Sequence, residues 1–157
     1  MILKKLDRQL EIVIRGEPFV AYRAWLAEMD VLLLKSYLVA YVWPPKVRTE
    51  AFCKGDDTPV WPGESIGNAP QSCDHDPTVL PGEYCSCGIY AHKTKQDTQR
   101  WMKGRDNRFV YGEVFLWGRV IECDWGYRAQ YAYPKSVYID SRLASLVAKR
   151  YELPAAA

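Results

Sequence analysis

The feature that most constrains the fold of this chain is a pair of cysteines on alternate residues, Cys85 and Cys87, at the end of a long proline-rich stretch. Residues 54–84 hold five of the ten prolines and six acidic residues against a single lysine. A compact domain rarely contains so long a loop without a reason, and metal ligation at both of its ends would hold it in place. The candidate ligands, of which we expect four to bind, are Cys53, Cys73, His75, Cys85 and Cys87.

Zinc is the metal that these residue types favour, because it binds thiolates and imidazoles in closely spaced pairs. Cys53, Cys85 and Cys87 are the firmest choices, while Cys73 and His75 compete for the fourth position. A site closed by four protein ligands is structural, since a catalytic zinc keeps one position open. The alternative interpretation is a set of scattered, reduced thiols.

The N-terminal residues mix charges with apolar side chains, which is not the pattern of a signal peptide. We therefore expect a cytoplasmic protein, where a reducing environment favours metal ligation by cysteines over disulfides. No apolar run approaches the ~20 residues that a membrane-spanning helix needs, so no membrane partner is expected.

Alternating apolar residues predict a fold that is α+β but mainly β. Residues 19–26, 31–35, 37–43 and 47–53 read as an antiparallel meander, and residues 109–122 and 127–133 as two longer strands, followed by a short strand at 137–139. Gly112 and Gly118 lie six residues apart on the apolar face of residues 109–122 and suggest bends that curl the sheet into a partly open barrel.

Two helices complete the expected fold. Residues 95–103 form a short basic helix that begins after Thr94, and residues 142–152 form an amphipathic C-terminal helix. We divide the chain into an N-terminal extension (1–18), a single zinc-stabilised β-rich domain (19–154) that contains the acidic loop 54–84, and a loose tail (155–157).

The aromatic content is high, with six tryptophans and eleven tyrosines in 157 residues. Such residues either fill a β-sheet core or form a stacking surface for planar ligands. If the second interpretation holds, the candidate ligand surface consists of Trp25, Trp43, Trp117 and Trp125; if these rings are buried, they belong to the core.

The net charge of +2 does not by itself imply a polyanionic partner, but the basic residues are clustered. The segment around the predicted basic helix is a candidate for contact with a nucleic acid backbone, or else a solvated helix face. Its candidate nucleic-acid-binding residues are Lys93, Lys95, Arg100, Lys103, Arg105 and Arg108.

The sequence contains few residues that could act as a catalytic nucleophile or transfer a proton. If His75 binds metal, only His92 remains for proton transfer, and Cys123 has no histidine near it in the sequence. An enzyme that uses Cys123 or His92 is therefore the weakest of the functional hypotheses.

Several motifs resemble those of a family of small bacterial and phage-type proteins with no assigned activity. The resemblance covers nearly the whole chain from Phe19 and implies one compact domain, but it implies no catalytic residues. The motifs that carry it are Tyr22-Arg23-Ala24-Trp25, Val42-Trp43-Pro44-Pro45, Cys85-x-Cys87-Gly88-Ile89-Tyr90-Ala91, Gly112-Glu113-Val114-x-Leu116-Trp117-Gly118-Arg119-Val120 and Gly126-Tyr127-Arg128-Ala129-x-x-Ala132-Tyr133-Pro134.

Together these observations predict a non-catalytic, zinc-stabilised binding module whose leading ligand is nucleic acid, alone or within a nucleoprotein complex. The alternative is a protein-interaction subunit or inhibitor of phage or mobile-element origin, which would present the acidic loop to a basic partner.

Overall fold

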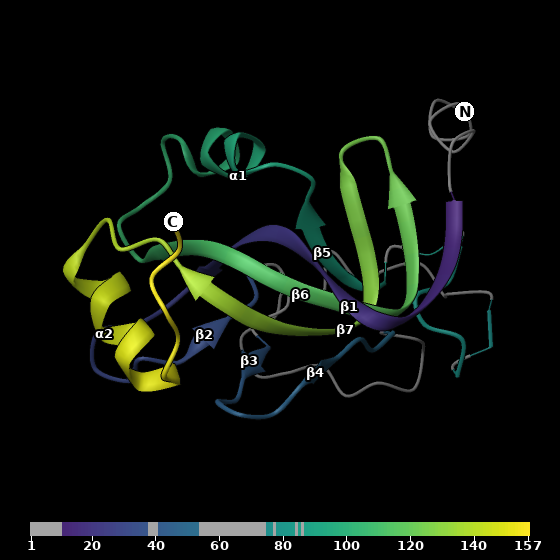
Figure 1. Cartoon of the computed structure of the whole chain (residues 1–157), viewed down its shortest axis with the longest axis horizontal. Coiled ribbons are helices and arrows are strands. Elements are labelled where there is room, and N and C mark those ends of the chain that lie inside the picture. Colours follow the sequence, from purple (N-terminus) through teal and green to yellow (C-terminus); the bar gives the residue numbers. More distant parts are fainter. Residues whose placement is uncertain (1–10, 38–40, 54–74, 77, 84, 86) are drawn as a thin grey trace, which may run out of the picture.

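The computed structural model describes residues 11–37, 41–53, 75–76, 78–83, 85 and 87–157. In these residues seven strands form one antiparallel sheet, accompanied by two helices (Figure 1). The elements in chain order are β1 (Glu11–Leu26), β2 (Leu34–Lys35), β3 (Val42–Trp43), β4 (Thr49–Glu50), β5 (Ile89–His92), α1 (Lys95–Met102), β6 (Phe109–Cys123), β7 (Gly126–Val137) and α2 (Arg142–Tyr151).

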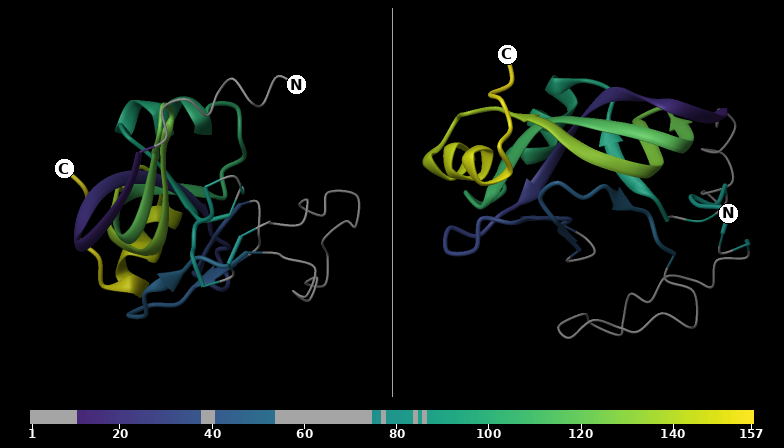
Figure 2. Two further views of the ribbon diagram at one scale, coloured as in Figure 1. Left: turned by 90° about the vertical axis from the view of Figure 1, so that its right-hand side faces the viewer. Right: turned by 60° about the horizontal axis from the view of Figure 1, so that its bottom comes forward.

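Four of the strands close into a ring, which confirms the mainly β, partly open barrel. β6 pairs with β1 on one side and β7 on the other, and β5 pairs with both β7 and β1. The contact that closes the ring is short, because β1 and β5 share only the pair Tyr22 and His92. In Figure 2 the long strands β1, β6 and β7 curve around one another, and α2 lies at one end of them.

Strand β1 is longer than expected and includes residues assigned to the N-terminal extension. Residues 11–15 pair with β6, and the register shifts between Arg15 and Phe19. Gly16 and Pro18 therefore mark an irregularity within one strand, because the chain returns to β6 after the shift.

Three other expectations about strands and tail need correction. β4 pairs with β7 instead of extending the β1–β2–β3 meander. The residues expected as a separate strand at 137–139 begin with Val137, which is the last residue of β7. The tail is fixed to this same end of β7, since Ala155 bridges Val137 and the Ala156 N–H donates to the Val137 carbonyl at 2.8 Å.

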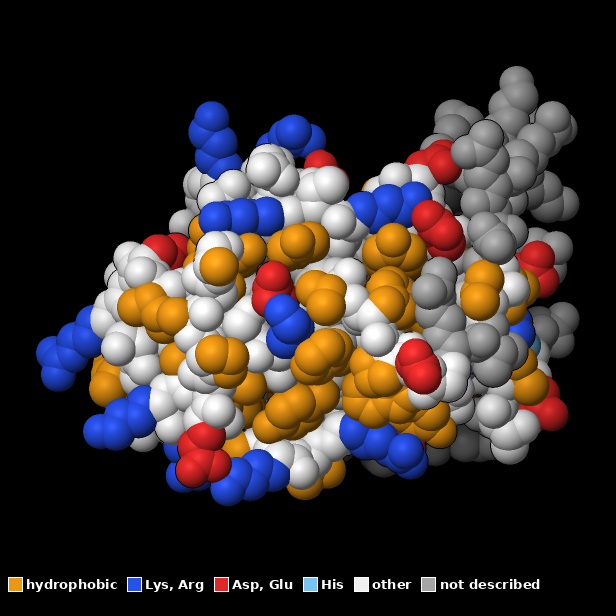
Figure 3. All heavy atoms as spheres, in the orientation of Figure 1, with side chains coloured by type: hydrophobic (Ala, Val, Ile, Leu, Met, Phe, Trp, Pro, Cys, Tyr) orange, Lys and Arg blue, Asp and Glu red, His pale blue; other side chains and the backbone are white. Residues whose placement is uncertain are grey.

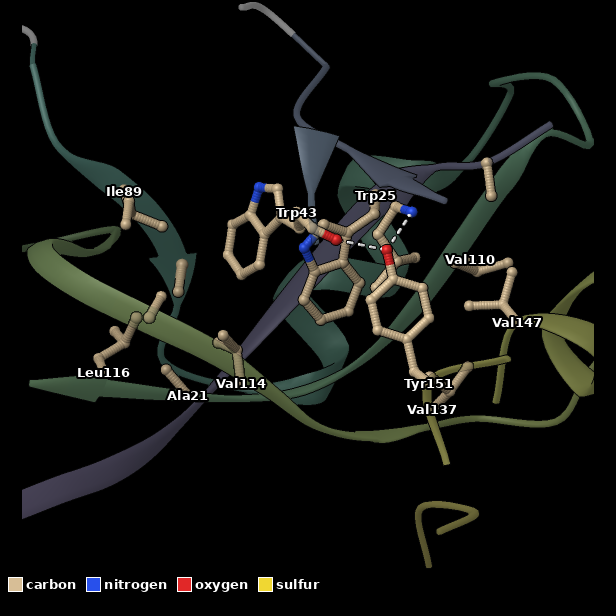
Figure 4. Close-up of a cluster of buried hydrophobic side chains, with 14 of the residues drawn as sticks. Ala21, Trp25, Trp43, Ile89, Val110, Val114, Leu116, Val137, Val147 and Tyr151 are labelled. Atoms are coloured by element: carbon tan, nitrogen blue, oxygen red, sulfur yellow. Dashed lines mark hydrogen bonds between the residues drawn. The ribbon is translucent and has the colours of Figure 1, made fainter. Parts of the chain in front are cut away.

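The core lies inside the ring and is built from the inward face of β6 together with two tryptophans. Val110, Val114 and Leu116 are fully buried, as their alternation predicts. Trp25 and Trp43 are also fully buried and pack edge to face, with ring centroids 5.5 Å apart (Figure 4). These two rings belong to the core, which corrects their assignment to a ligand surface.

Both helices begin at a side-chain cap. The Thr94 hydroxyl accepts from the Asp97 N–H at 3.1 Å and the Ser141 hydroxyl from the Ala144 N–H at 3.1 Å. α1 packs on the outside of the barrel, where Trp101 and Met102 cover Phe109 and Tyr111. Among the described residues, no helix has the length and apolar character needed to span a membrane.

Tyr151 of α2 ties the helix to the β2–β3 hairpin through a buried hydroxyl. The hydroxyl accepts from the Leu34 N–H at 2.8 Å and donates to the Trp43 carbonyl at 2.5 Å (Figure 4). Leu34 and Trp43 are both buried and face each other in the β2–β3 ladder, and the tyrosine hydroxyl binds a main-chain group of each.

We expect the substitution Tyr151→Phe to lower the free energy of unfolding by about 2 kcal/mol, because it removes two buried hydrogen bonds that tie α2 to the β2–β3 hairpin. The measurement is urea unfolding followed by circular dichroism. The matched control is Tyr133→Phe, which removes an exposed hydroxyl that accepts from the Lys46 N–H at 2.7 Å and should cost less than about 1 kcal/mol. Equal losses in the two variants would contradict this interpretation of Tyr151.

Candidate metal centre

Four potential metal ligands converge although the first and the last lie 34 positions apart in the sequence. One ligand atom from each of Cys53, His75, Cys85 and Cys87 lies within 4.8 Å of every other, and all four residues are partly buried. Cys53 follows β4, whereas the other three precede β5, so the cluster joins the two ends of the acidic segment. The group can hold a metal ion. Of the two candidates for the fourth position, His75 joins the cluster and Cys73 lies outside the described residues.

Two of the distances between the candidate ligand atoms are close to the edges expected for a tetrahedral metal site. Zn–S bonds of about 2.3 Å and Zn–N bonds of about 2.0–2.1 Å place two sulfurs about 3.8 Å apart, and a sulfur and a nitrogen about 3.6 Å apart, at the corners of a tetrahedron. The sulfurs of Cys53 and Cys85 are 3.6 Å apart, and the Cys87 sulfur is 3.5 Å from His75 Nε2.

Main-chain groups orient the ligands. His75 Nδ1 lies 2.9 Å from the Asp76 carbonyl, so the Nδ1–H tautomer donates there and leaves the Nε2 lone pair facing the sulfurs. The Gly82 N–H lies 3.2 Å from the Cys87 sulfur and donates to it. Such outer-shell hydrogen bonds are typical of metal sites, where they fix the ligand rotamers.

Gly82 is needed for a steric reason as well. A Cβ atom at this position would lie 2.3 Å from Cδ2 of His75, a distance at which the ring would have to move. The close approach of the main chain to the imidazole therefore depends on glycine.

The strongest support for the loop comes from Arg128 of β7, whose side chain is almost completely buried. Its guanidinium donates to the carbonyls of Gly82 at 3.1 Å, Glu83 at 3.1 Å and Cys87 at 3.0 Å, and also to that of Cys85. From β6, Arg119 Nε donates to the Pro81 carbonyl at 2.9 Å. The two guanidinium groups thus hold the ligand-bearing loop against the barrel.

The protonation and redox states of the sulfurs decide when a metal can bind. Burial, together with the neighbouring Cys87, raises the pKa of the Cys53 thiol to about 11, so metal binding would release its proton. Cys85 is disulfide-bonded in this structure, and a sulfur in a disulfide offers no thiolate. The form of the cluster that can bind metal through all four ligands is therefore the reduced one.

The predicted basic segment lies along α1 and the loop after it, and half of its cations are paired with acids. The three ion pairs are Lys93–Glu122 at 2.9 Å, Arg100–Asp97 at 3.2 Å and Arg108–Asp106 at 2.8 Å.

The other three cations of this segment have no ion pair among the described residues. The Lys95 ammonium lies 4.0 Å from the centre of the Tyr138 ring, and the Arg105 guanidinium lies 3.8 Å from that of Trp101. Lys103 is exposed at the C-terminal end of α1. These three cations remain available to an anionic partner.

The other two tryptophans of the candidate ligand surface are at least partly accessible to solvent, and they lie at different positions on the barrel. Trp125 is 45% exposed at the turn between β6 and β7 and stacks on Tyr90, with ring centroids 5.1 Å apart. Trp117 is partly buried on β6 and lies beside Tyr131 of β7, at 5.8 Å.

The two residues of the enzyme hypothesis are held by other groups. The buried thiol of Cys123 is directed toward the Ile121 carbonyl, and His92 Nδ1 lies 3.0 Å from the Thr98 hydroxyl. Desolvation lowers the pKa of His92. No hydrogen bond joins Cys123 to His92 in the described part of the chain, so they do not form a nucleophile–base pair.

We expect the substitution Arg128→Lys to lower the free energy of unfolding by at least about 2 kcal/mol, because a single ammonium cannot reach carbonyls spread along the loop. Urea unfolding of the reduced protein is the measurement. Arg119→Lys is the matched control, since it removes one donated bond to the loop and should have the smaller effect. Similar losses in both variants would show that Arg128 does not organise the loop as we infer.

Comparison with known proteins gives no further support for any function. No family model, no curated protein and no solved structure matches this chain. The resemblance to bacterial and phage-type proteins stays a prediction, and the function has to be argued from the geometry of the site and of the surface.

Proposed function

We propose that this chain is a non-catalytic, zinc-stabilised module that binds nucleic acid in the cytoplasm. The observation that supports the zinc site is the convergence of three sulfurs and one imidazole within 4.8 Å of one another, with two of the distances close to the edges of a zinc tetrahedron. Four protein ligands leave no open position for a substrate, so the proposed ion stabilises the fold. A reducing compartment keeps Cys85 available as a ligand.

The proposal that this chain binds nucleic acid is supported by the positive charge around α1. Between Lys93 and Arg108 there are six cations and two acids, and Figure 3 shows Lys and Arg side chains projecting along the edge of the molecule where α1 lies. The ammonium group of Lys95 and the guanidinium group of Arg105 lie over aromatic rings. Because the rings already restrict these side chains, little side-chain entropy is lost when they bind an anion. Such an arrangement suits phosphates better than a carboxylate-rich protein surface, because it presents fixed point charges along one edge.

Protein purified in the presence of reductant and without chelator is expected to contain about one zinc ion per chain. Cys53→Ser and Cys87→Ser should each lose the ion, whereas Cys123→Ser, the same change outside the cluster, should retain it. For the imidazole, His75→Gln should lose zinc and His92→Gln should keep it. Elemental analysis gives the stoichiometry.

Two results would contradict parts of the zinc proposal. Less than about half a zinc ion per wild-type chain would remove the structural site altogether. Loss of zinc in Cys73→Ser together with retention in His75→Gln would replace His75 by Cys73 as the fourth ligand.

For nucleic-acid binding we expect the triple variant Lys95→Glu, Lys103→Glu, Arg105→Glu, which reverses the three cations without an ion pair, to abolish measurable affinity for a fluorescently labelled 20-nucleotide single strand. The wild-type logarithmic salt slope should be about −2, as three unpaired cations imply for a single strand. The measurement is fluorescence anisotropy between 50 and 200 mM salt.

The matched control changes the same amount of charge on the other helix, α2. Arg142, Lys149 and Arg150 are exposed on α2, and their reversal to glutamate should weaken binding far less than reversal on α1. Equal weakening by the two triple variants would indicate a response to net charge alone and would remove α1 as the binding edge.

A further inference from the structure

The outer face of β6 changes character halfway along the strand. Its first part, at Phe109 and Tyr111, is covered by Trp101 and Met102 of α1. Beyond Glu113 the outward residues are again aromatic, but they are only partly buried. Phe115 and Trp117 of this second part lie beside Tyr131 and Tyr133 of β7. We call these four residues the aromatic strip.

The four rings form two rows across neighbouring strands. Phe115 lies directly opposite Tyr133 in the β6–β7 ladder, and Trp117 lies opposite Tyr131. The planes of the second pair are inclined by 32°, with ring centroids 5.8 Å apart. Because two paired strands carry the rings, their spacing is fixed before any ligand arrives.

Cations adjoin the strip, and a hollow lies between them and the rings. The guanidinium of Arg48 lies 4.3 Å from the centre of the Tyr131 ring, and the Lys46 N–H donates to the Tyr133 hydroxyl. A depression of about 500 Å³ is lined by Lys46 and Arg48 on one side and by Phe115 and Trp117 on another. That volume suits one or two nucleobases, which are small and planar.

Acids accompany these cations without removing them from solvent. Arg48 pairs with Glu50 at 2.7 Å and Lys46 with Glu152 at 2.7 Å. The side chains of Arg48 and Lys46 are 52% and 74% exposed, and exposed pairs are weak enough for a phosphate to replace the carboxylate.

We propose that the aromatic strip is a stacking platform for the unpaired bases of a single-stranded nucleic acid, with Lys46 and Arg48 contacting its phosphates. This inference rests on the proposed function and adds a second surface. The strip would contact the bases, whereas the cations around α1 contact the phosphates. Aromatic side chains on a barrel face beside cations are the general means of binding single strands, since every base has a face that can stack. The space-filling view in Figure 3 shows hydrophobic side chains gathered over the long strands, on the same face as the cations of the α1 edge.

The test compares ligands of equal charge in fluorescence anisotropy. The probes are a labelled 20-nucleotide poly(dT), an abasic strand with the same number of phosphates, and a GC-rich 10-base-pair duplex, whose two strands together carry nearly the same number. We expect the wild-type protein to bind poly(dT) about tenfold or more tighter than the abasic strand, and Trp117→Ala and Tyr131→Ala each to lose most of that difference. Trp117→Phe, which keeps a ring, should retain it.

Trp125→Ala is the matched control, because it removes an exposed tryptophan outside the strip and should leave the affinity for poly(dT) unchanged. Urea unfolding of each variant verifies that the barrel is intact, and Trp117→Phe tests the strip should the alanine variant be unfolded.

The outcomes separate this inference from the proposed function. If poly(dT) and the abasic strand bind equally well, or if strip variants bind poly(dT) as the wild type does while reversal on α1 abolishes binding, the strip is not the platform and the nucleic-acid function stands. Loss in Trp125→Ala alone would place stacking at the β6–β7 turn and overturn the inference. Tighter binding of the duplex than of poly(dT) would overturn it too. If the wild type binds none of the three probes, both proposals fail.

Discussion

The buried guanidinium of Arg128 is the interaction on which the arrangement of the loop and barrel depends. A buried charge is costly unless hydrogen bonds replace its hydration, and here four main-chain carbonyls do so. Every one of these carbonyls belongs to the short stretch that carries Cys85 and Cys87. The strand therefore specifies the conformation of the loop, and the loop in turn satisfies a charge that β7 could not otherwise bury.

Much of the barrel was predictable because its signals are local. The alternation along residues 109–122 places Val110, Val114 and Leu116 inside, and the structure buries all three. Gly118 has a positive φ of 81° at a register shift between β6 and β7, as expected for a glycine that bends a strand. Helix caps at Thr94 and Ser141 are likewise encoded within four residues, so no tertiary contact is needed to recognise them.

The features that sequence reasoning missed are those that depend on distant partners. Arg128 looks like an ordinary strand residue, since nothing nearby shows that it will meet the carbonyls of a loop more than 40 residues earlier. Gly16 and Pro18 are typical of a turn, yet pairing with β6 on both sides of them keeps one strand. Trp25 and Trp43 are hidden because β2 and β3 fold back over the ring, which composition cannot reveal. The candidate metal ligands were recognised by residue type and spacing, and only the fold could bring Cys53 to the other three.

The position of the candidate metal centre couples it to the closure of the barrel. β5 begins at Ile89, two residues after Cys87, and it is the strand that joins β7 to β1. Its bond to β1 is slight: one residue pair, reinforced by Arg23, whose guanidinium donates to the Tyr90 carbonyl. A strand held so weakly on one side relies on the segment that leads into it. An ion at the cluster would anchor that segment at Cys87, while Arg128 anchors it from β7. A bound ion would therefore stabilise the ring itself as well as the loop, because the strand that completes the ring starts two residues after the last candidate ligand.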